Sequence, residues 1–131
     1  MEVALLLDTN RLTDALKGDP EAVRAIQSAL DVRLPFVVRA EMRASIAGGD
    51  ERLRAHNEGS LLRFLALAGV QVPYPDQETT EVYARLFVDL KRAGTPIPTN
   101  DLWIAALAVQ HHLTLYTRDQ HFRLVPQIAL H

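Results

Sequence analysis

Hydrophobic residues occur in this chain either as short continuous runs or as stripes at helical spacing. Residues 3–7 form an unbroken apolar run without polar alternation, which is typical of a strand covered on both faces in a parallel sheet. Comparable short runs predict further strands over residues 34–38, 70–72 and 114–117, with a last short strand within residues 126–130. The pattern therefore predicts four or five strands.

The segments between these runs have the spacing and the end signals of helices. Val82, Leu86 and Leu90 fall on one face of a helix, and Asp19 followed by Pro20 is typical of an N-cap and a first helical residue. The predicted helices cover residues 10–17, 20–30, 40–49, 50–67, 79–92 and 101–109.

Strands that alternate with helices predict an α/β fold with a mainly parallel sheet of four or five strands flanked by helices. The chain of 131 residues is the length of one domain, and no linker divides it. We therefore expect a single domain over residues 1–131.

The amino-acid composition excludes several kinds of functional site. The chain has no cysteine, which excludes disulfides, thiolate metal sites and cysteine nucleophiles. No apolar run approaches the roughly 20 residues needed to span a bilayer, so we expect no membrane association and a cytoplasmic location. The net charge of −2 opposes nucleic-acid binding by bulk charge. If carboxylates are gathered round a cation, however, the remaining surface is more basic, so net charge alone is indecisive.

Four acidic residues lie where predicted strands lead into the next segment. Asp8 ends the first strand, Glu41 lies in the first turn of the helix after the second, Asp101 begins the 101–109 helix, and Asp119 follows the 114–117 strand. Because ligands of open parallel sheets bind beyond the carboxyl ends of the strands, we expect these four side chains to converge.

Four neighbouring carboxylates raise one another's pKa unless a cation compensates their charge. Oxygen ligands of this kind suit Mg²⁺ or Mn²⁺, and such an ion can lower the pKa of a bound water and orient a phosphate. The expected chemistry is hydrolysis of a phosphodiester.

Each acid also has an ordinary structural interpretation. Asp8 could be the N-cap of the following helix, and Asp101 could interact with a helix dipole. Glu41 could be a solvated helix residue, and Asp119 could begin a turn. Only their joint placement at one predicted edge favours a metal site.

Four segments carry a family resemblance: LLLDTN at 5–10, AEMRAS at 40–45, PTNDLWIAALA at 98–108 and LYTRDQHF at 115–122. In this order they resemble the motifs of PIN-domain ribonucleases, in particular the VapC-type toxins of bacterial toxin–antitoxin modules, over nearly the whole chain. The resemblance implies a Rossmann-like sheet, cleavage of single-stranded RNA with Mg²⁺ or Mn²⁺, a cognate antitoxin that blocks the site, and a homodimer.

The resemblance also implies roles for individual residues. Asp8, Asp101 and Asp119 would be the metal ligands, and Glu41 would complete the catalytic cluster. The residues expected to brace the site are Thr9, Asn10, Asn100 and Thr117. Four arginines near the acids in sequence could contact RNA phosphates, with an ordinary surface role as the alternative: Arg11, Arg39, Arg43 and Arg118. His121 could contact the substrate or have only a surface or packing role.

Three other classes of protein share part of this pattern. Haloacid-dehalogenase-like phosphatases need a second aspartate two residues after the first, and Asn10 stands there. Response-regulator receivers need an acidic pair and a late lysine, and neither is present. A catalytically inert PIN-like module that binds RNA or a protein partner is the third alternative. Because all four acids are present, the sequence favours the nuclease.

Overall fold

The computed structural model describes residues 3–67 and 69–131. Within them, five parallel strands form one sheet in the order β3-β2-β1-β4-β5. The strands are β1 (Ala4–Leu7), β2 (Asp31–Arg33), β3 (Val70–Gln71), β4 (Thr114–Tyr116) and β5 (Ala129–Leu130). The α/β fold with a parallel sheet that the sequence predicts is confirmed.

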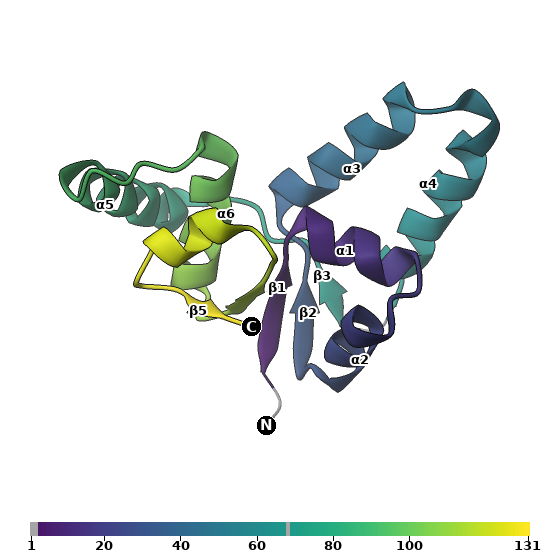
Figure 1. The fold of residues 1–131 in the computed structure, drawn as a ribbon, viewed down its shortest axis with the longest axis horizontal. Helices are drawn as coiled ribbons and strands as arrows, with labels where there is room; N and C mark the ends of the chain where they lie inside the picture. The colour runs from purple at the N-terminus through teal and green to yellow at the C-terminus, as the bar shows by residue number, and fades with distance from the viewer. Residues whose placement is uncertain (1–2, 68) are drawn as a thin grey trace.

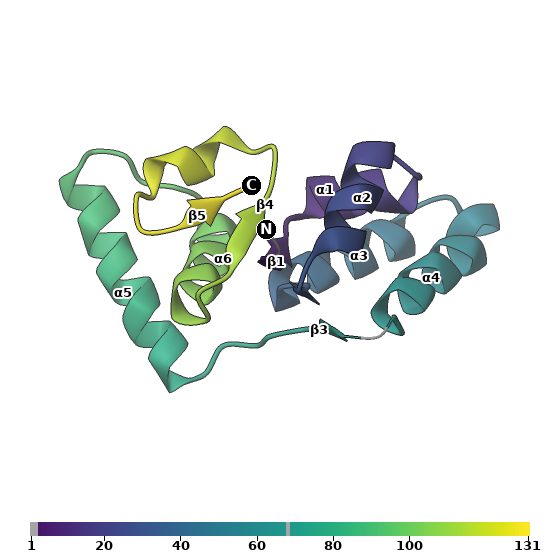
Figure 2. The same ribbon diagram turned by 90° about the horizontal axis from the view of Figure 1, so that it is seen from below.

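The helices form two groups on either side of β1 (Figures 1 and 2). One group comprises α1 (Thr9–Leu16), α2 (Pro20–Ser28), α3 (Phe36–Gly48) and α4 (Glu51–Leu65). The other comprises α5 (Gln77–Arg92), α6 (Thr99–Gln110) and the short 3₁₀ helix η1 (Gln120–Leu124). The extended segment after β3 carries the chain from the first group to the second (Figure 2). None of the helices in the described ranges is long and apolar enough to cross a membrane.

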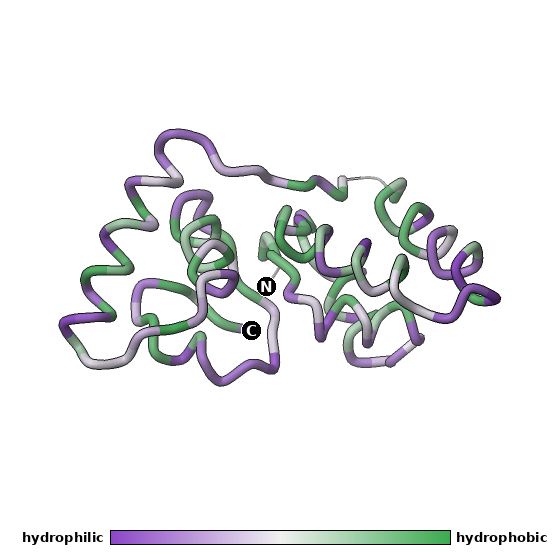
Figure 3. Tube along the Cα trace, turned by 90° about the horizontal axis from the view of Figure 1, so that it is seen from above, coloured by the Kyte–Doolittle hydropathy of each residue, from purple (hydrophilic) through white to green (hydrophobic). Residues whose placement is uncertain are grey.

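Strand β1 is the centre of the core. Leu5, Leu6 and Leu7 are at most 1% exposed, as expected for a strand with neighbours on both sides and helices on both faces. The strand pairs with β2 through Leu5 and Val32, and with β4 through Leu6 and Leu115. Hydrophobic residues accordingly concentrate along the central strands, whereas the turn between α3 and α4 is hydrophilic (Figure 3).

Local signals set the ends of α1 and α2. Gly18 has a φ of +84°, in the left-handed region that favours glycine. Its N–H donates to the Ala15 carbonyl at 3.0 Å and the next N–H, of Asp19, donates to the Asp14 carbonyl at 3.0 Å, which is the Schellman pattern. The Asp19 side chain then accepts from the Ala22 N–H at 3.0 Å and begins α2. The predicted boundary between the two helices is thus confirmed.

The strand predicted over residues 34–38 is wrong. The strand is β2, three residues earlier, and α3 begins at Phe36 after Pro35 in the N-cap position. Val37 and Val38 are apolar because the first turn of α3 packs into the core, where they are 5% and 0% exposed. As a consequence, Glu41 lies in the second turn of α3 rather than in the first.

The order of the strands creates a crevice between β1 and β4. The chain leaves β1 for β2 on one side and later returns to place β4 on the other, which is the switch point where open α/β sheets bind ligands. The Asp8 N–H donates to the Tyr116 carbonyl at 3.1 Å, so the two strands end together. Residues 8–10 therefore lie beside residues 117–119.

Candidate active site

Asp8 is a buried carboxylate at the carboxyl end of β1. Its side chain is held by three donors and the residue is only 7% exposed. The Thr9 N–H donates to one oxygen at 2.8 Å, which makes Asp8 the N-cap of α1. The Thr117 hydroxyl donates to the other oxygen at 2.7 Å, and the Asn10 amide lies 3.4 Å from it. The capping role and the position at the sheet edge thus coexist in one residue.

The Thr117 hydroxyl connects the ends of β1 and β4. It accepts from the Asp119 N–H at 2.9 Å and from the Asn10 amide at 3.3 Å, while donating to Asp8. The side-chain oxygen Oδ1 of Asn10 in turn accepts from the Arg118 backbone N–H at 3.2 Å. This network fixes where Asp8 and Asp119 stand relative to each other.

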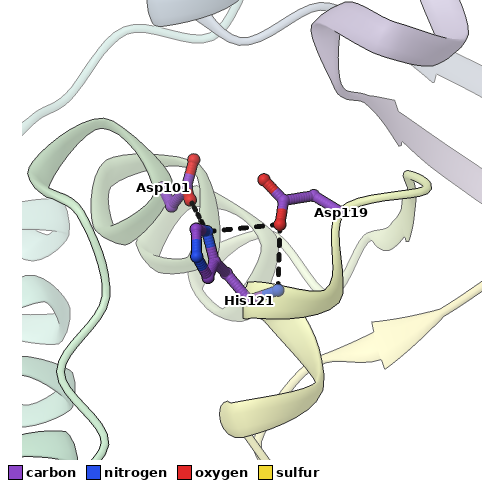
Figure 4. Close-up of side chains that lie close together, drawn as sticks. All are labelled: Asp101, Asp119 and His121. Carbon is purple, nitrogen blue, oxygen red and sulfur yellow. Dashed lines mark hydrogen bonds and ion pairs between the residues drawn. The ribbon is translucent and has the colours of Figure 1, made fainter.

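Asp101 and Asp119 meet at the ring of His121 (Figure 4). Asp101 comes from the first turn of α6, and Asp119 is the N-cap of η1. The Nδ1 atom of His121 lies 3.0 Å from Asp101 Oδ2 and 3.2 Å from Asp119 Oδ1. One possible ligand atom from each of the three side chains lies within 4.8 Å of the others.

The carboxyl of Asp101 has a raised pKa. Burial raises the pKa of the Asp101 carboxyl above its ordinary value, while the hydrogen bond with His121 lowers it. The charges of Asp119 and Asp8 raise this pKa further. Asp8 is therefore close enough to Asp101 to act on its ionisation, although the two make no direct contact.

Glu41 lies at the periphery of this group. Its Oε2 accepts from the Thr9 hydroxyl at 2.8 Å, so it is joined to Asp8 through the neighbouring residue in α1. Glu41 and Thr9 also line a cleft of about 440 Å³ between α1, α3 and α4, together with Ser45 and His56. Glu41 is thus placed where a substrate that extends from the acids into the cleft would pass.

Two of the four candidate arginines are paired with Asp14. Arg118 contacts both Asp14 oxygens, at 3.0 and 3.1 Å, and its side chain remains 55% exposed. Arg11 lies 3.5 Å from Asp14 and stacks over the Tyr116 ring, with its side chain only 15% exposed. The Arg11 guanidinium is therefore committed to internal contacts.

The other two arginines flank Glu41 on α3. In the described ranges, neither Arg39 nor Arg43 forms an ion pair, and both are half-buried. Asn100, expected to brace the carboxylates, has an exposed side chain that makes no hydrogen bond with any described residue. The structure does bring Thr9, Asn10 and Thr117 to the acids, as described above.

The sequence did not predict that His121 lies between Asp101 and Asp119. The signal was its position two residues after Asp119: an N-cap carboxylate accepts the backbone N–H two residues on, here at 2.9 Å, which holds the next side chains beside it. The donor set of carboxylates with an adjacent imidazole suits a divalent cation.

This fold and site define a family. A model of the PIN domain matches residues 5–128, so the chain belongs to the PIN-domain family. Toxin FitB of Neisseria gonorrhoeae is 36% identical over 124 residues, covering 88% of this chain and 87% of FitB. The VapC ribonuclease Y4jK of Sinorhizobium fredii is 33% identical over 126 residues, covering 88% of this chain and 86% of that protein.

Solved structures agree with this assignment. VapBC-1 from nontypeable Haemophilus influenzae contains a chain that is 26% identical, with a TM-score of 0.81 over 98% of this chain and 96% of that one. VapBC2 from Rickettsia felis, bound to a DNA fragment from its promoter, gives a TM-score of 0.84 at 22% identity, over 98% and 97% of the two chains. The second likeness supports the fold alone.

Proposed function

We propose that this chain is a metal-dependent endoribonuclease toxin that hydrolyses phosphodiester bonds of single-stranded RNA and is neutralised by a cognate antitoxin. The observation that carries the proposal is the meeting of Asp101 and Asp119 at the His121 ring near the carboxyl ends of β1 and β4, where the Thr117 hydroxyl joins the Asp8 carboxylate to the Asp119 N–H. The relatives named as ribonucleases and toxins support the same activity.

In this proposal Asp8, Asp101 and Asp119 hold one or more divalent cations, Mg²⁺ or Mn²⁺. A bound cation would lower the pKa of a water and neutralise the charge that develops on the phosphate. Thr117 and Asn10 orient Asp8 through their hydrogen bonds, as partners of ligating carboxylates generally do.

The remaining acid and the arginines act on the substrate. Glu41, held by the Thr9 hydroxyl, would position the attacking water at the entrance of the cleft. Arg39 and Arg43 lie two residues before and after Glu41 in α3 and form no ion pair with a described residue, so they are assigned to RNA phosphates, because phosphate contacts by arginine fix the register of a nucleic acid.

Binding partners are proposed on the same basis. Solved relatives are described as VapBC and FitAB assemblies, which supports an antitoxin partner for this chain. We also propose that residues 1–131 form one domain and that the protein acts in the cytoplasm, where it would meet its RNA substrate. A homodimer is also proposed, because α5 exposes Phe87 and Val88, which are 50% and 40% exposed, beside its buried stripe. Light scattering of the pure protein tests the dimer, and a monomer would refute it.

Cleavage of a labelled single-stranded RNA tests the activity. The antitoxin-free protein is incubated with Mg²⁺, with Mn²⁺ and with EDTA. We expect cutting with either ion and none with EDTA. Absence of metal-dependent cutting, with RNA binding retained, would instead support a catalytically inert PIN-like module.

A further inference from the structure

The Nδ1 atom of His121 faces two carboxylates at once. A ring nitrogen of histidine carries at most one hydrogen. Nδ1 nevertheless lies 3.0 Å from an Asp101 oxygen and 3.2 Å from an Asp119 oxygen. With a hydrogen, Nδ1 must divide one donor between two anions; without one, its lone pair faces both. A cation between the three atoms would satisfy all of them.

The spacing of these atoms matches that of neighbouring ligands on one ion. In an octahedral shell with ligands at about 2.1 Å, adjacent ligand atoms lie about 3.0 Å apart. Both distances from Nδ1 are close to this value, and the three candidate atoms lie within 4.8 Å of one another. Little movement is needed for the imidazole to become a ligand.

The fold holds the ring in this position. The His121 N–H donates to the Asp119 side chain at 2.9 Å, which fixes the first turn of η1. The next residue, Phe122, is 0% exposed and anchors that turn in the core. The His121 side chain is still 51% exposed, so a hydrated ion can reach it.

We infer that His121 Nδ1 is a ligand of the same cation that Asp101 and Asp119 hold, and that this imidazole shifts the site's preference from Mg²⁺ towards Mn²⁺. Mg²⁺ takes oxygen ligands and dehydrates reluctantly, whereas first-row transition ions also accept imidazole; Mn²⁺ is the weakest binder of that series, so the expected shift in preference is modest. The inference rests on the proposed metal-dependent function, and its test separates the two.

The test measures Mn²⁺ bound to the full chain by electron paramagnetic resonance, without RNA. Pulsed spectra of the wild type should contain a nitrogen coupling that changes when histidine is labelled with ¹⁵N. The coupling should vanish in His121→Ala. The affinity of this variant for Mn²⁺ should fall about ten-fold or more, because even the loss of a residue that only hydrogen-bonds to a metal ligand typically costs that much. A lower concentration of Mg²⁺ should then displace the bound Mn²⁺. His112→Asn, at an exposed histidine after the other end of α6 whose φ of +54° asparagine tolerates, is the matched control and should leave both results unchanged.

Three outcomes would overturn the inference. Mn²⁺ bound to the wild type without nitrogen coupling would leave the proposed nuclease intact but exclude His121 as a ligand. Coupling that persists in His121→Ala would assign the nitrogen to another residue. If the wild type binds no Mn²⁺ at all, the proposed metal dependence fails together with the ligand assignment.

Discussion

The N-termini of α5 and α6 each carry an aspartate, but the two aspartates have opposite environments. Asp76 caps α5: it accepts from the Thr79 N–H at 3.0 Å and from the Gln110 amide at 2.9 Å, and the Thr79 hydroxyl accepts from the Asp76 N–H. These donors, the Thr79 N–H first, lower the pKa of Asp76. Asp101 caps nothing, since the N-cap of α6 is Pro98 and no side chain caps this helix, and burial raises the pKa of Asp101.

The difference is the one expected between a carboxylate that stabilises the fold and a carboxylate of the proposed metal site. An acid in the first turn of a helix is normally stabilised by the free N–H groups and the dipole there. Asp101 gives up much of this stabilisation by turning towards His121 and Asp119. Ionisable groups kept in unfavourable surroundings concentrate at functional sites.

The largest expected effect is on activity. Asp101→Asn should lower RNA cleavage by at least about 100-fold, because removal of one electrostatic group from an active site typically costs that much. Asp76→Asn, the same change at the other helix, should leave cleavage unchanged. Initial rates on a labelled single-stranded RNA at saturating Mg²⁺ measure both. Equal losses in the two variants would remove the distinction between them.

Asp8 should affect both stability and activity, because it caps α1 and is also one of the proposed metal ligands. Asp8→Asn should lose cleavage as Asp101→Asn does. It should also lose about 1–2 kcal/mol of stability, since the new amide group faces the donors that now serve the carboxylate. Urea unfolding in metal-free buffer measures the second effect. Unchanged stability would show that these hydrogen bonds contribute little.

A smaller effect is expected at Thr117, which connects Asp8 with Asp119. Thr117→Val keeps the shape but removes the hydroxyl, so Mn²⁺ affinity should fall about ten-fold. Thr80→Val is the control, because the Thr80 hydroxyl only donates to the Gln77 carbonyl on the exposed face of α5. Titration calorimetry with Mn²⁺ measures both. Similar affinities for both variants would contradict an orienting role of Thr117.

Stability should depend on pH with opposite sign at the two helices. The pKa of Asp76 is lowered from 3.8, so its ionised form stabilises the fold above that pH, and this is lost as pH falls through the folded pKa. The pKa of Asp101 is raised, so its ionised form destabilises the fold until pH falls through that higher value.

Asparagine variants isolate these charges. At neutral pH and without metal, Asp76→Asn should be less stable than the wild type and Asp101→Asn should be equally or more stable. Both differences should shrink as the pH approaches about 3.5, where aspartates protonate. Denaturant unfolding across this range provides the measurement, and differences of the same sign would contradict the assignment.

The smallest effect concerns the exposed arginine at the site. Arg118→Ala should change stability by no more than about 0.5 kcal/mol, because its pair with Asp14 is largely solvent-exposed. If Arg118 also meets RNA, KM should rise with kcat unchanged. Arg52→Ala is the control, since Arg52 likewise pairs with an aspartate, Asp50, at a helix N-terminus far along the chain. Equal KM values for Arg118→Ala and Arg52→Ala would show that Arg118 pairs with Asp14 and does not contact RNA.

The sequence predicts the fold well where local signals and burial agree. The apolar run of β1 and the Gly18–Asp19–Pro20 boundary belong to this class. The prediction failed at residues 34–38, where Val37 and Val38 favour a strand locally but pack into the core as the first turn of a helix. Apolar runs of this length do not distinguish the two structures.

The site is predictable in its acids but not in their surroundings. Asp8 and Asp119 follow from their positions after strands and from the motifs, whereas Asp101, which comes after α5 and not after a strand, follows from its motif alone. The contrast between Asp76 and Asp101 does not, because both are acids at the start of a helix. What separates them is the burial of Asp101 by the tertiary fold, beside residues such as His121, which is twenty residues away in the chain.

The two outermost strands, β3 (Val70–Gln71) and β5 (Ala129–Leu130), have two residues each. Long open edges allow a foreign strand to add to a sheet and start fibrous aggregates. Edges this short offer such a strand few free backbone groups. Polymerisation of this chain by sheet extension therefore has little to begin from.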